Sequence, residues 1–254
     1  MPTDRQSPEA LYDASAKAWA RNEPSSLSDF TARPAVLSLC APCAGARVLD
    51  LGCGEGYCAR KLRRAGATEV LGIDVSSGMI AAAIAEEQRA PLGIHYRQGD
   101  ATDLGDLEGE SYDLAVAVFL FNYLPRDAMR ICMREVRRLL RPGGRFVFSV
   151  PHPAFPFMRA PAPPFFFDLG GESYYGACDR RFPGKIWKRD GSALEVQVVH
   201  KTFEDYFHAL RKAGFDALPE VRELGVTPEL VQMDPEFFGP LLGVPLHLAL
   251  SVTC

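Results

Sequence analysis

One short stretch of the chain combines glycines with a carboxylate in a spacing that suits ligand binding. The segment 48–56 is an apolar run that contains Asp50 and ends in a Gly-x-Gly-x-Gly turn formed by Gly52, Gly54 and Gly56. Glycine lets a ligand approach the backbone closely. A second acid, Asp74, lies 24 residues after Asp50, at the end of the next predicted strand, where a carboxylate can accept both hydroxyls of a ribose. The pattern predicts a site for a ligand that contains adenosine.

The spacing of the glycines separates two classes of adenosine ligand. The dinucleotide fingerprint is Gly-x-Gly-x-x-Gly, and the helix that follows it binds a pyrophosphate through its N-terminus. Here the third glycine comes one residue earlier, and Asp50 precedes the turn. A carboxylate repels phosphate and suits an ammonium group. A nicotinamide-dependent oxidoreductase remains a rival hypothesis, but it conflicts with this spacing.

The elements that must position these groups alternate between strand and helix. Strands are predicted at 47–51, 70–75, 94–97, 112–121, 146–150, 194–200 and 246–252. Helices are predicted at 8–20, at 26–40, from the glycine turn to Arg64, at 79–87, at 127–140 and after Thr202. Apolar strands separated by helical patterns indicate an α/β fold, a Rossmann-like, doubly wound, seven-stranded and mostly parallel sheet with helices on both faces. Ligands bind such a sheet at the carboxyl ends of its strands.

The composition changes after the fifth predicted strand. Between Phe155 and Trp187, nine of 33 residues are aromatic, against 10% of the whole chain. This segment is too short for a core of its own, so we expect an insertion rather than a second domain. We predict a single domain over 1–254, with an N-terminal helical cap at 1–44, a cofactor-binding core at 45–151, an aromatic insertion or lid at 152–193 and a C-terminal completion of the sheet at 194–254.

The chain resembles the class I S-adenosylmethionine-dependent methyltransferases in five segments that follow the family's order. These are Asp50 to Gly56, Asp74, Gly99-Asp100-Ala101, Tyr112-Asp113-Leu114 and Leu140-Arg141-Pro142-Gly143-Gly144. The resemblance implies S-adenosyl-L-methionine as cofactor and S-adenosyl-L-homocysteine as product. It also implies cofactor contacts from Tyr12, Trp19, Asp50, Gly52, Cys53, Gly54, Gly56, Asp74, Val75, Met79, Gly99, Asp100, Ala101, Phe119, Leu120 and Tyr123.

Individual roles follow from the same resemblance. Asp50 and the Gly52 backbone would hold the methionine ammonium, Asp74 the ribose, and Asp100 the adenine amino group. Tyr12 and Trp19, on the N-terminal helix, would cover the cofactor. Simpler interpretations stay open: an aspartate can serve as a helix cap, Cys53 can be a small filler of the turn, and Met79 and Phe119 can belong to the core.

Methyl transfer needs alignment and water exclusion more than acid–base groups. His152 follows the fifth strand at the carboxyl edge of the sheet and is the candidate general base, although a histidine between two prolines can also serve to order a loop. The aromatic insertion would provide walls for a flat or apolar acceptor, with substrate contacts from Phe155, Tyr174, Tyr175 and His152. These aromatic residues could equally pack the insertion onto the core.

The charge and composition of the chain limit the classes of molecule that it is expected to bind. The net charge is −4, so the chain lacks the basic excess typical of nucleic-acid binding. Methyltransferases that flip a base often carry Asn or Asp followed by Pro-Pro-aromatic after the fourth strand, whereas residues 122–125 read Asn-Tyr-Leu-Pro. We expect a small-molecule acceptor, no nucleic acid and no membrane, and a monomer or homodimer.

Charged residues near the N-terminus and the pattern of cysteines bear on the cellular location of the protein and on whether it binds a metal. Asp4, Arg5 and Glu9 argue against a secretory leader, and seven cysteines without a regular framework fit reduced thiols in the cytoplasm. Cys40 and Cys43 form a Cys-x-x-Cys that has no second half, so no metal is expected.

The sequence therefore predicts a methyltransferase that acts on an oxygen or nitrogen atom of a small molecule. A carbon acceptor is the less favoured alternative. A protein of the same fold that binds the cofactor as a scaffold or regulator, without transfer, is the rival from another functional class.

Overall fold

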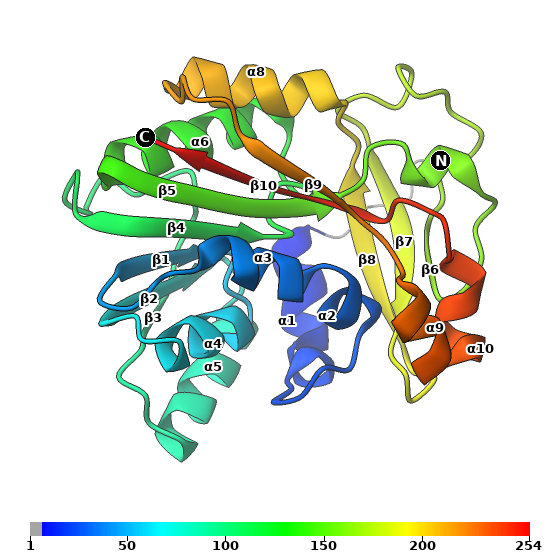
Figure 1. Cartoon of the computed structure of the whole chain (residues 1–254), viewed down its shortest axis with the longest axis horizontal. Helices are drawn as coiled ribbons and strands as arrows, with labels where there is room; N and C mark the ends of the chain where they lie inside the picture. Colours follow the sequence, from blue (N-terminus) through cyan, green and yellow to red (C-terminus); the bar gives the residue numbers. More distant parts are fainter. Residues whose placement is uncertain (1–6) are drawn as a thin grey trace.

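The computed structural model describes residues 7–254 and contains a seven-stranded sheet in the order β3-β2-β1-β4-β5-β10-β9 (Figure 1). Its strands are β1 (Arg47–Leu51), β2 (Glu69–Asp74), β3 (His95–Gln98), β4 (Tyr112–Val118), β5 (Leu140–Pro151), β9 (Glu220–Leu224) and β10 (His247–Thr253). The first five are parallel, and β10 runs antiparallel to both β5 and β9. The predicted α/β fold with a mostly parallel sheet is confirmed.

Helices cover both faces of this sheet (Figure 1). They are α3 (Arg33–Cys40), α4 (Tyr57–Arg64) and α5 (Ser77–Arg89) on one face and α6 (Arg126–Leu139) and α8 (Phe203–Ala213) on the other. Two apolar cores result, one between the sheet and α6 with α8, the other between the sheet and α3 with α4. Because both faces are covered, the central strands carry apolar residues on both sides.

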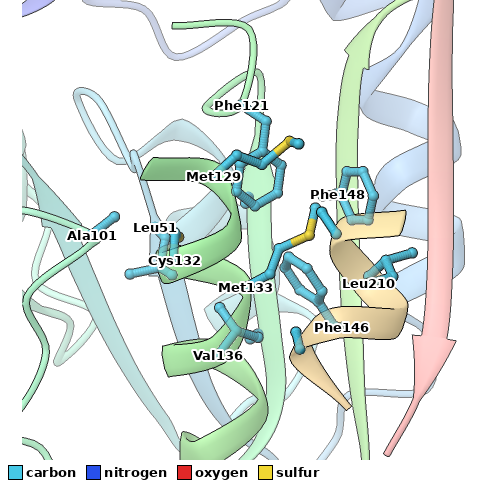
Figure 2. Close-up of a cluster of buried hydrophobic side chains, with 14 of the residues drawn as sticks. Leu51, Ala101, Phe121, Met129, Cys132, Met133, Val136, Phe146, Phe148 and Leu210 are labelled. Atoms are coloured by element: carbon cyan, nitrogen blue, oxygen red, sulfur yellow. The ribbon is translucent and has the colours of Figure 1, made fainter. Parts of the chain in front are cut away.

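The predicted apolar stripe of α6 lies in the first of these cores. Met129, Cys132, Met133 and Val136 recur at helical spacing, and all four are fully buried. Figure 2 shows Met133 and Val136 on the side of Phe146 of β5, Met129 beside Phe121, and Cys132 beside Leu51 of β1. This packing anchors the carboxyl end of β4, which carries part of the site described below.

The helix predicted over 26–40 is interrupted near Pro34, a residue whose position favours a start or a kink of the helix there. After α1 (Pro8–Trp19), the structure has α2 (Leu27–Thr31) and then α3, with a break at Ala32, whose φ and ψ are −130° and −53°. Pro34 explains the break, since its ring would clash with a carbonyl of the preceding turn and it has no N–H to donate. The break turns α2 away from the direction of α3.

The aromatic insertion forms a sheet of its own. It contains α7 (Phe155–Met158), β6 (Phe165–Phe167), β7 (Arg181–Trp187) and β8 (Ala193–Val199), and the antiparallel order is β6-β7-β8. The strand predicted at 194–200 thus pairs with β7 and not with the main sheet, so the C-terminal completion of the sheet begins later than residue 194. The short helices α9 (Pro228–Met233) and α10 (Pro235–Phe238) follow β9.

A third apolar core joins the cap to the small sheet. Trp19 and Leu27 from the cap pack in one cluster with Phe165, Phe167 and other residues of the insertion. Figure 1 shows the small sheet beside the carboxyl edge of the main sheet, next to α1 and α2. The two segments therefore enclose that edge together.

Two predictions concern the ends of the chain and membranes. Asp4 and Arg5, which argued against a secretory leader, lie outside the described residues, as do the first six residues of the predicted cap. Among the helices of residues 7–254, none combines the length and apolar character needed to cross a bilayer.

Candidate functional site

A cavity of about 400 Å³ lies at the carboxyl ends of β1, β2 and β4, enclosed by the cap and the small sheet. Every residue predicted to contact the cofactor lines it, apart from Gly56. The lining includes Tyr12, Trp19, Asp50, Gly52, Cys53, Gly54, Asp74, Val75, Met79, Gly99, Asp100, Ala101, Phe119, Leu120 and Tyr123. Segments distant in sequence are thus brought to one edge of the sheet, where ligands of such folds bind.

The glycine turn is held by its own backbone and by Asp74. Gly52 N donates to Ile73 O at 2.8 Å, and Gly54 N donates to Asp74 Oδ2 at 2.8 Å. Gly52 and Gly54 have φ values of +65° and +56°, in the left-handed region that other residues rarely adopt. Gly56 does not line the cavity. It makes room for Tyr96, whose hydroxyl would collide with a side chain at that position.

Asp50 is a buried carboxylate with one unused oxygen. The residue is 1% exposed, and its Oδ2 has no hydrogen-bond partner among the described residues. Burial, together with the charge of Asp74, raises the pKa of Asp50 to about 7. A cation in the cavity would supply the missing partner and favour the ionised form.

Asp74 and Asp100 line the same cavity further along the sheet edge. Asp74 Oδ1 accepts from Ser76 N at 2.9 Å, and burial raises the pKa of this carboxyl. Asp100 Oδ1 accepts from both the N–H and the hydroxyl of Thr102 at 2.8 Å. These bonds orient the two carboxylates, as expected for groups that read the hydroxyls and amines of a ligand.

The cap closes the cavity with aromatic rings. The hydroxyls of Tyr12 and Tyr123 form a hydrogen bond that joins α1 to the loop after β4, and burial raises the pKa of Tyr12. Trp19 stacks obliquely on Tyr12, with ring centres 5.8 Å apart, and its Nε1 has no partner among the described residues. Both predicted covering residues are therefore in the cavity wall.

Two arginines that sequence reasoning missed also line the cavity. Arg21 binds Asp29 and Glu55, each at 2.9 Å, and so joins the cap to the glycine turn. Arg33 binds Asp29 at 2.9 Å and lies over the Phe119 ring. Burial opposes ionisation of Asp29, but Arg33 and Arg21 outweigh it and lower its pKa to about 2. The pair Asp29 and Arg33, four residues apart, was the available sequence signal.

The four residues predicted to bind the acceptor are not brought into the cavity, although all lie in the described part of the chain. His152 is buried, and its Nε2 lies 2.9 Å from Glu223 Oε1. Pro151, the last residue of β5, lines the cavity, whereas the ring of His152 packs on Phe203 beside Glu223 and does not. The general base predicted at His152 is thus misplaced.

The three aromatic residues predicted to contact the acceptor also lie outside the cavity wall. Tyr175 is 80% exposed, and Tyr174 packs on Phe157 and His200. Phe155 stacks behind Phe165, with ring centres 4.7 Å apart. The insertion instead lines the cavity with Phe165, Phe167, Arg181, Ile186 and Val196.

Unpartnered polar atoms are concentrated in this wall. Among buried side-chain atoms without a partner in the described residues, the following belong to cavity-lining residues: Trp19 Nε1, Arg21 Nε, Asp50 Oδ2, Asn122 Oδ1 and His247 Nδ1. A buried polar group without a partner costs about 1–3 kcal/mol. Donors and acceptors that converge on one cavity therefore indicate a polar ligand with both kinds of group.

Comparison with known proteins agrees with this geometry. A family model described as a methyltransferase domain matches residues 48–144. The crystal structure of an S-adenosylmethionine-dependent methyltransferase from Mesorhizobium loti is 30% identical, with a TM-score of 0.66 over 87% of this chain and 96% of that one. The CcbJ methyltransferase from Streptomyces caelestis, at 22% identity, shares the fold, with a TM-score of 0.64 over 97% of both chains.

Curated relatives match about half of the chain or less. The ubiquinone biosynthesis O-methyltransferase of Alkalilimnicola ehrlichii is 32% identical over 146 residues, which is 55% of this chain and 57% of that protein. The enzyme of the same name from Pseudomonas savastanoi pv. phaseolicola is 33% identical over 42% of this chain and 44% of its own length. The chain thus spans about half the length of the curated relatives it matches.

Proposed function

Because this chain belongs to the S-adenosylmethionine-dependent methyltransferases, we propose that it transfers the methyl group to an oxygen atom of a small, largely apolar acceptor. The observation that carries the proposal is the cavity, which Asp50, Asp74 and Asp100 line together with the aromatic residues Phe165 and Phe167 of the insertion. The names of the curated relatives, which specify O-methylation in ubiquinone biosynthesis, support an oxygen acceptor over nitrogen or carbon.

The residues present fit the cofactor. The unused Oδ2 of buried Asp50 suits the methionine ammonium, and Arg33 in the same wall suits the methionine carboxylate. Asp74 would accept from the ribose hydroxyls and Asp100 from the adenine amino group, with Met79 and Val75 packed on the adenine. When bound, S-adenosylmethionine supplies a methyl group made electrophilic by its sulfonium sulfur.

The protein's contribution to the reaction is orientation and exclusion of water. Phe119, Phe165 and Phe167 provide apolar walls, and the hydrogen bond between Tyr12 and Tyr123 keeps the cap closed over the site. Positive charge disappears from sulfur during an in-line displacement, so a low-polarity pocket that aligns the reactants lowers the barrier. Such a pocket would hold the acceptor oxygen in line; as the oxygen–methyl bond forms and the sulfur–methyl bond breaks, the hydroxyl proton of the acceptor would pass to solvent.

Calorimetric titration with S-adenosylhomocysteine tests the donor site, and methylation of a panel of phenols, alcohols, carboxylic acids and amines tests the acceptor. We expect a dissociation constant below about 1 mM for S-adenosylhomocysteine, which corresponds to about −4 kcal/mol. We also expect label from ¹³C-methyl S-adenosylmethionine to appear in an O-methyl product. Labelling of nitrogen or carbon would overturn the oxygen assignment. Tight cofactor binding without transfer to any compound of the panel would favour the scaffold alternative.

A further inference from the structure

His247 is a buried histidine in the cavity wall that the sequence did not single out. It is the first residue of β10, is 1% exposed and pairs across the strands with Pro151. Its ring lies against Phe119 and Phe165, with ring centres 5.1 and 5.7 Å apart. It is thus a polar group set among the apolar walls of the acceptor side.

We assign the proton of the His247 ring from its neighbour Thr31. Thr31 Oγ1 donates to Leu27 O at 3.0 Å, and it lies 3.0 Å from His247 Nε2. A hydroxyl has one proton to donate, so with that proton on Leu27 its oxygen accepts from His247 Nε2–H. This assignment leaves Nδ1 as a bare lone pair, and Nδ1 has no partner among the described residues.

The ring is neutral in its surroundings. Burial, with the positive charge of Arg33 adding to it, lowers the pKa of His247 to about 3. Nδ1 is therefore a hydrogen-bond acceptor at ordinary pH and not a donor. Sites built to bond a hydroxyl reject analogues that lack it, because their buried polar group is then left without a partner.

We propose that His247 Nδ1 accepts a hydrogen bond from the hydroxyl of the methyl acceptor and so selects planar apolar molecules that carry an O–H group. The inference rests on the proposed O-methyl transfer. His247 acts as a positioning and specificity residue: it holds the acceptor oxygen between Phe119 and Phe165, at the wall next to the donor site. Thr31 acts through His247, since it holds the tautomer that leaves Nδ1 free to accept.

The tautomer can be read directly by NMR of protein labelled with ¹⁵N-histidine and saturated with S-adenosylhomocysteine. We expect His247 to be protonated at Nε2, with an Nδ1 resonance typical of an unprotonated nitrogen. We expect Thr31→Val to give a detectable Nδ1–H population. Protonation of Nδ1 in the unmodified protein would overturn the proposal, whatever the acceptor is.

Pairs of ligands that differ only in a hydroxyl or a methyl group test whether the site selects hydroxyl compounds. Phenol, 1-naphthol and 2-naphthol are compared with toluene, 1-methylnaphthalene and 2-methylnaphthalene on the protein saturated with S-adenosylhomocysteine. At least one hydroxyl compound should bind about tenfold more tightly than its methyl counterpart and shift the Nδ1 resonance. Equal or absent binding across all pairs would overturn the proposal, while normal binding of S-adenosylhomocysteine would leave the methyl-donor site intact.

Variants separate positioning from structural support. His247→Gln keeps a donor that can reach Thr31 but places no acceptor at Nδ1, so it should abolish the preference for hydroxyl compounds. His247→Asn keeps an acceptor near the position of Nδ1 and should retain part of the preference for hydroxyl compounds. His200→Asn is the control, since that ring is also buried with an unpartnered Nε2 but does not line the cavity. Unchanged S-adenosylhomocysteine affinity shows that a variant is folded, and loss of preference in His200→Asn would contradict the proposal.

Discussion

Asp74 accepts a hydrogen bond from the backbone N–H of Gly54, with 2.8 Å between Oδ2 and the nitrogen. The carboxylate at the end of β2 thus holds the glycine turn at the end of β1, and the two parts of the cofactor site share one bond. Its other oxygen is oriented by Ser76 N. Each oxygen of Asp74 therefore has a defined direction before any ligand binds, which reduces the ordering cost of binding.

Replacing Asp74 by alanine should weaken S-adenosylhomocysteine binding at least about tenfold, because the ribose hydroxyls lose their hydrogen-bond acceptor and the glycine turn loses the bond from Gly54 N. Calorimetry with adenosine and 2′,3′-dideoxyadenosine identifies the cause: the unmodified protein should prefer adenosine, and Asp74→Ala should not. Asp106→Ala removes an exposed carboxylate with the same charge and serves as control. A retained preference in Asp74→Ala would contradict the ribose assignment.

Binding of S-adenosylhomocysteine should strengthen as pH rises through 7. The ligand's ammonium requires the ionised form of Asp50, and a pKa of about 7 leaves that form scarce at pH 6. Between pH 6 and pH 8 the affinity should rise about tenfold. The same shift opposes folding, since the carboxyl loses its proton at lower pH in the unfolded chain, so its contribution to stability declines from about pH 4 to pH 7.

Two controls isolate the role of Asp50 in this pH dependence. 5′-Methylthioadenosine lacks the amino acid part, so its affinity should not follow the titration. Asp50→Asn should flatten the curve for S-adenosylhomocysteine. An unchanged slope in that variant would assign the effect to another group.

Removing Arg21 should destabilise the cap. The Arg21→Ala variant removes one ion-pair partner from each of the buried carboxylates Asp29 and Glu55, which keep Arg33 and Arg60, so we expect a loss of about 2 kcal/mol from the charged hydrogen bonds that disappear. Urea unfolding followed by circular dichroism measures this loss. Arg130→Ala breaks an exposed pair with Asp127 and should leave the unfolding midpoint where it is. Equal midpoints for the two variants would contradict the structural role of Arg21.

Lys201 should make stability increase with pH above neutrality. Its Nζ is buried and donates to Phe121 O at 2.9 Å and Val199 O at 3.0 Å, and burial lowers its pKa to about 7. Between pH 7 and pH 9 the unfolded chain binds a proton that the folded chain has released. The unmodified protein should therefore gain about 2 kcal/mol over Lys201→Met in that range.

A second, exposed lysine serves as the control when the Lys201 variant is unfolded in urea at pH 7 and pH 9. Lys185→Met replaces an exposed lysine that pairs with Glu195, and its stability should follow the unmodified protein at both pH values. Parallel stability curves for the unmodified protein and Lys201→Met would show that the buried ammonium does not titrate in this range.

The sequence alone was sufficient to predict that the residues at the ends of β1 and β2 lie together, and the structure places them in the wall of one cavity. Asp50, the glycines and Asp74 lie in consecutive strand and turn segments, and the positions of their groups depend on local backbone geometry. Parallel strands place their carboxyl ends at one edge, so residues at those ends converge whatever the rest of the chain does. The buried stripe of α6 was predictable for a similar reason, since helical spacing depends on nearby residues.

Only the tertiary structure decided the acceptor side. Thr31, Phe165 and His247 come from the cap, the small sheet and the last strand, and no periodicity relates them. Their meeting depends on the pairing of β10 with β5 and on the packing of the cap against the insertion. His152 illustrates the limit: it follows the last residue of β5, and its contacts with Glu223 of β9 and Phe203 of α8, which are distant in sequence, hold its ring outside the cavity wall.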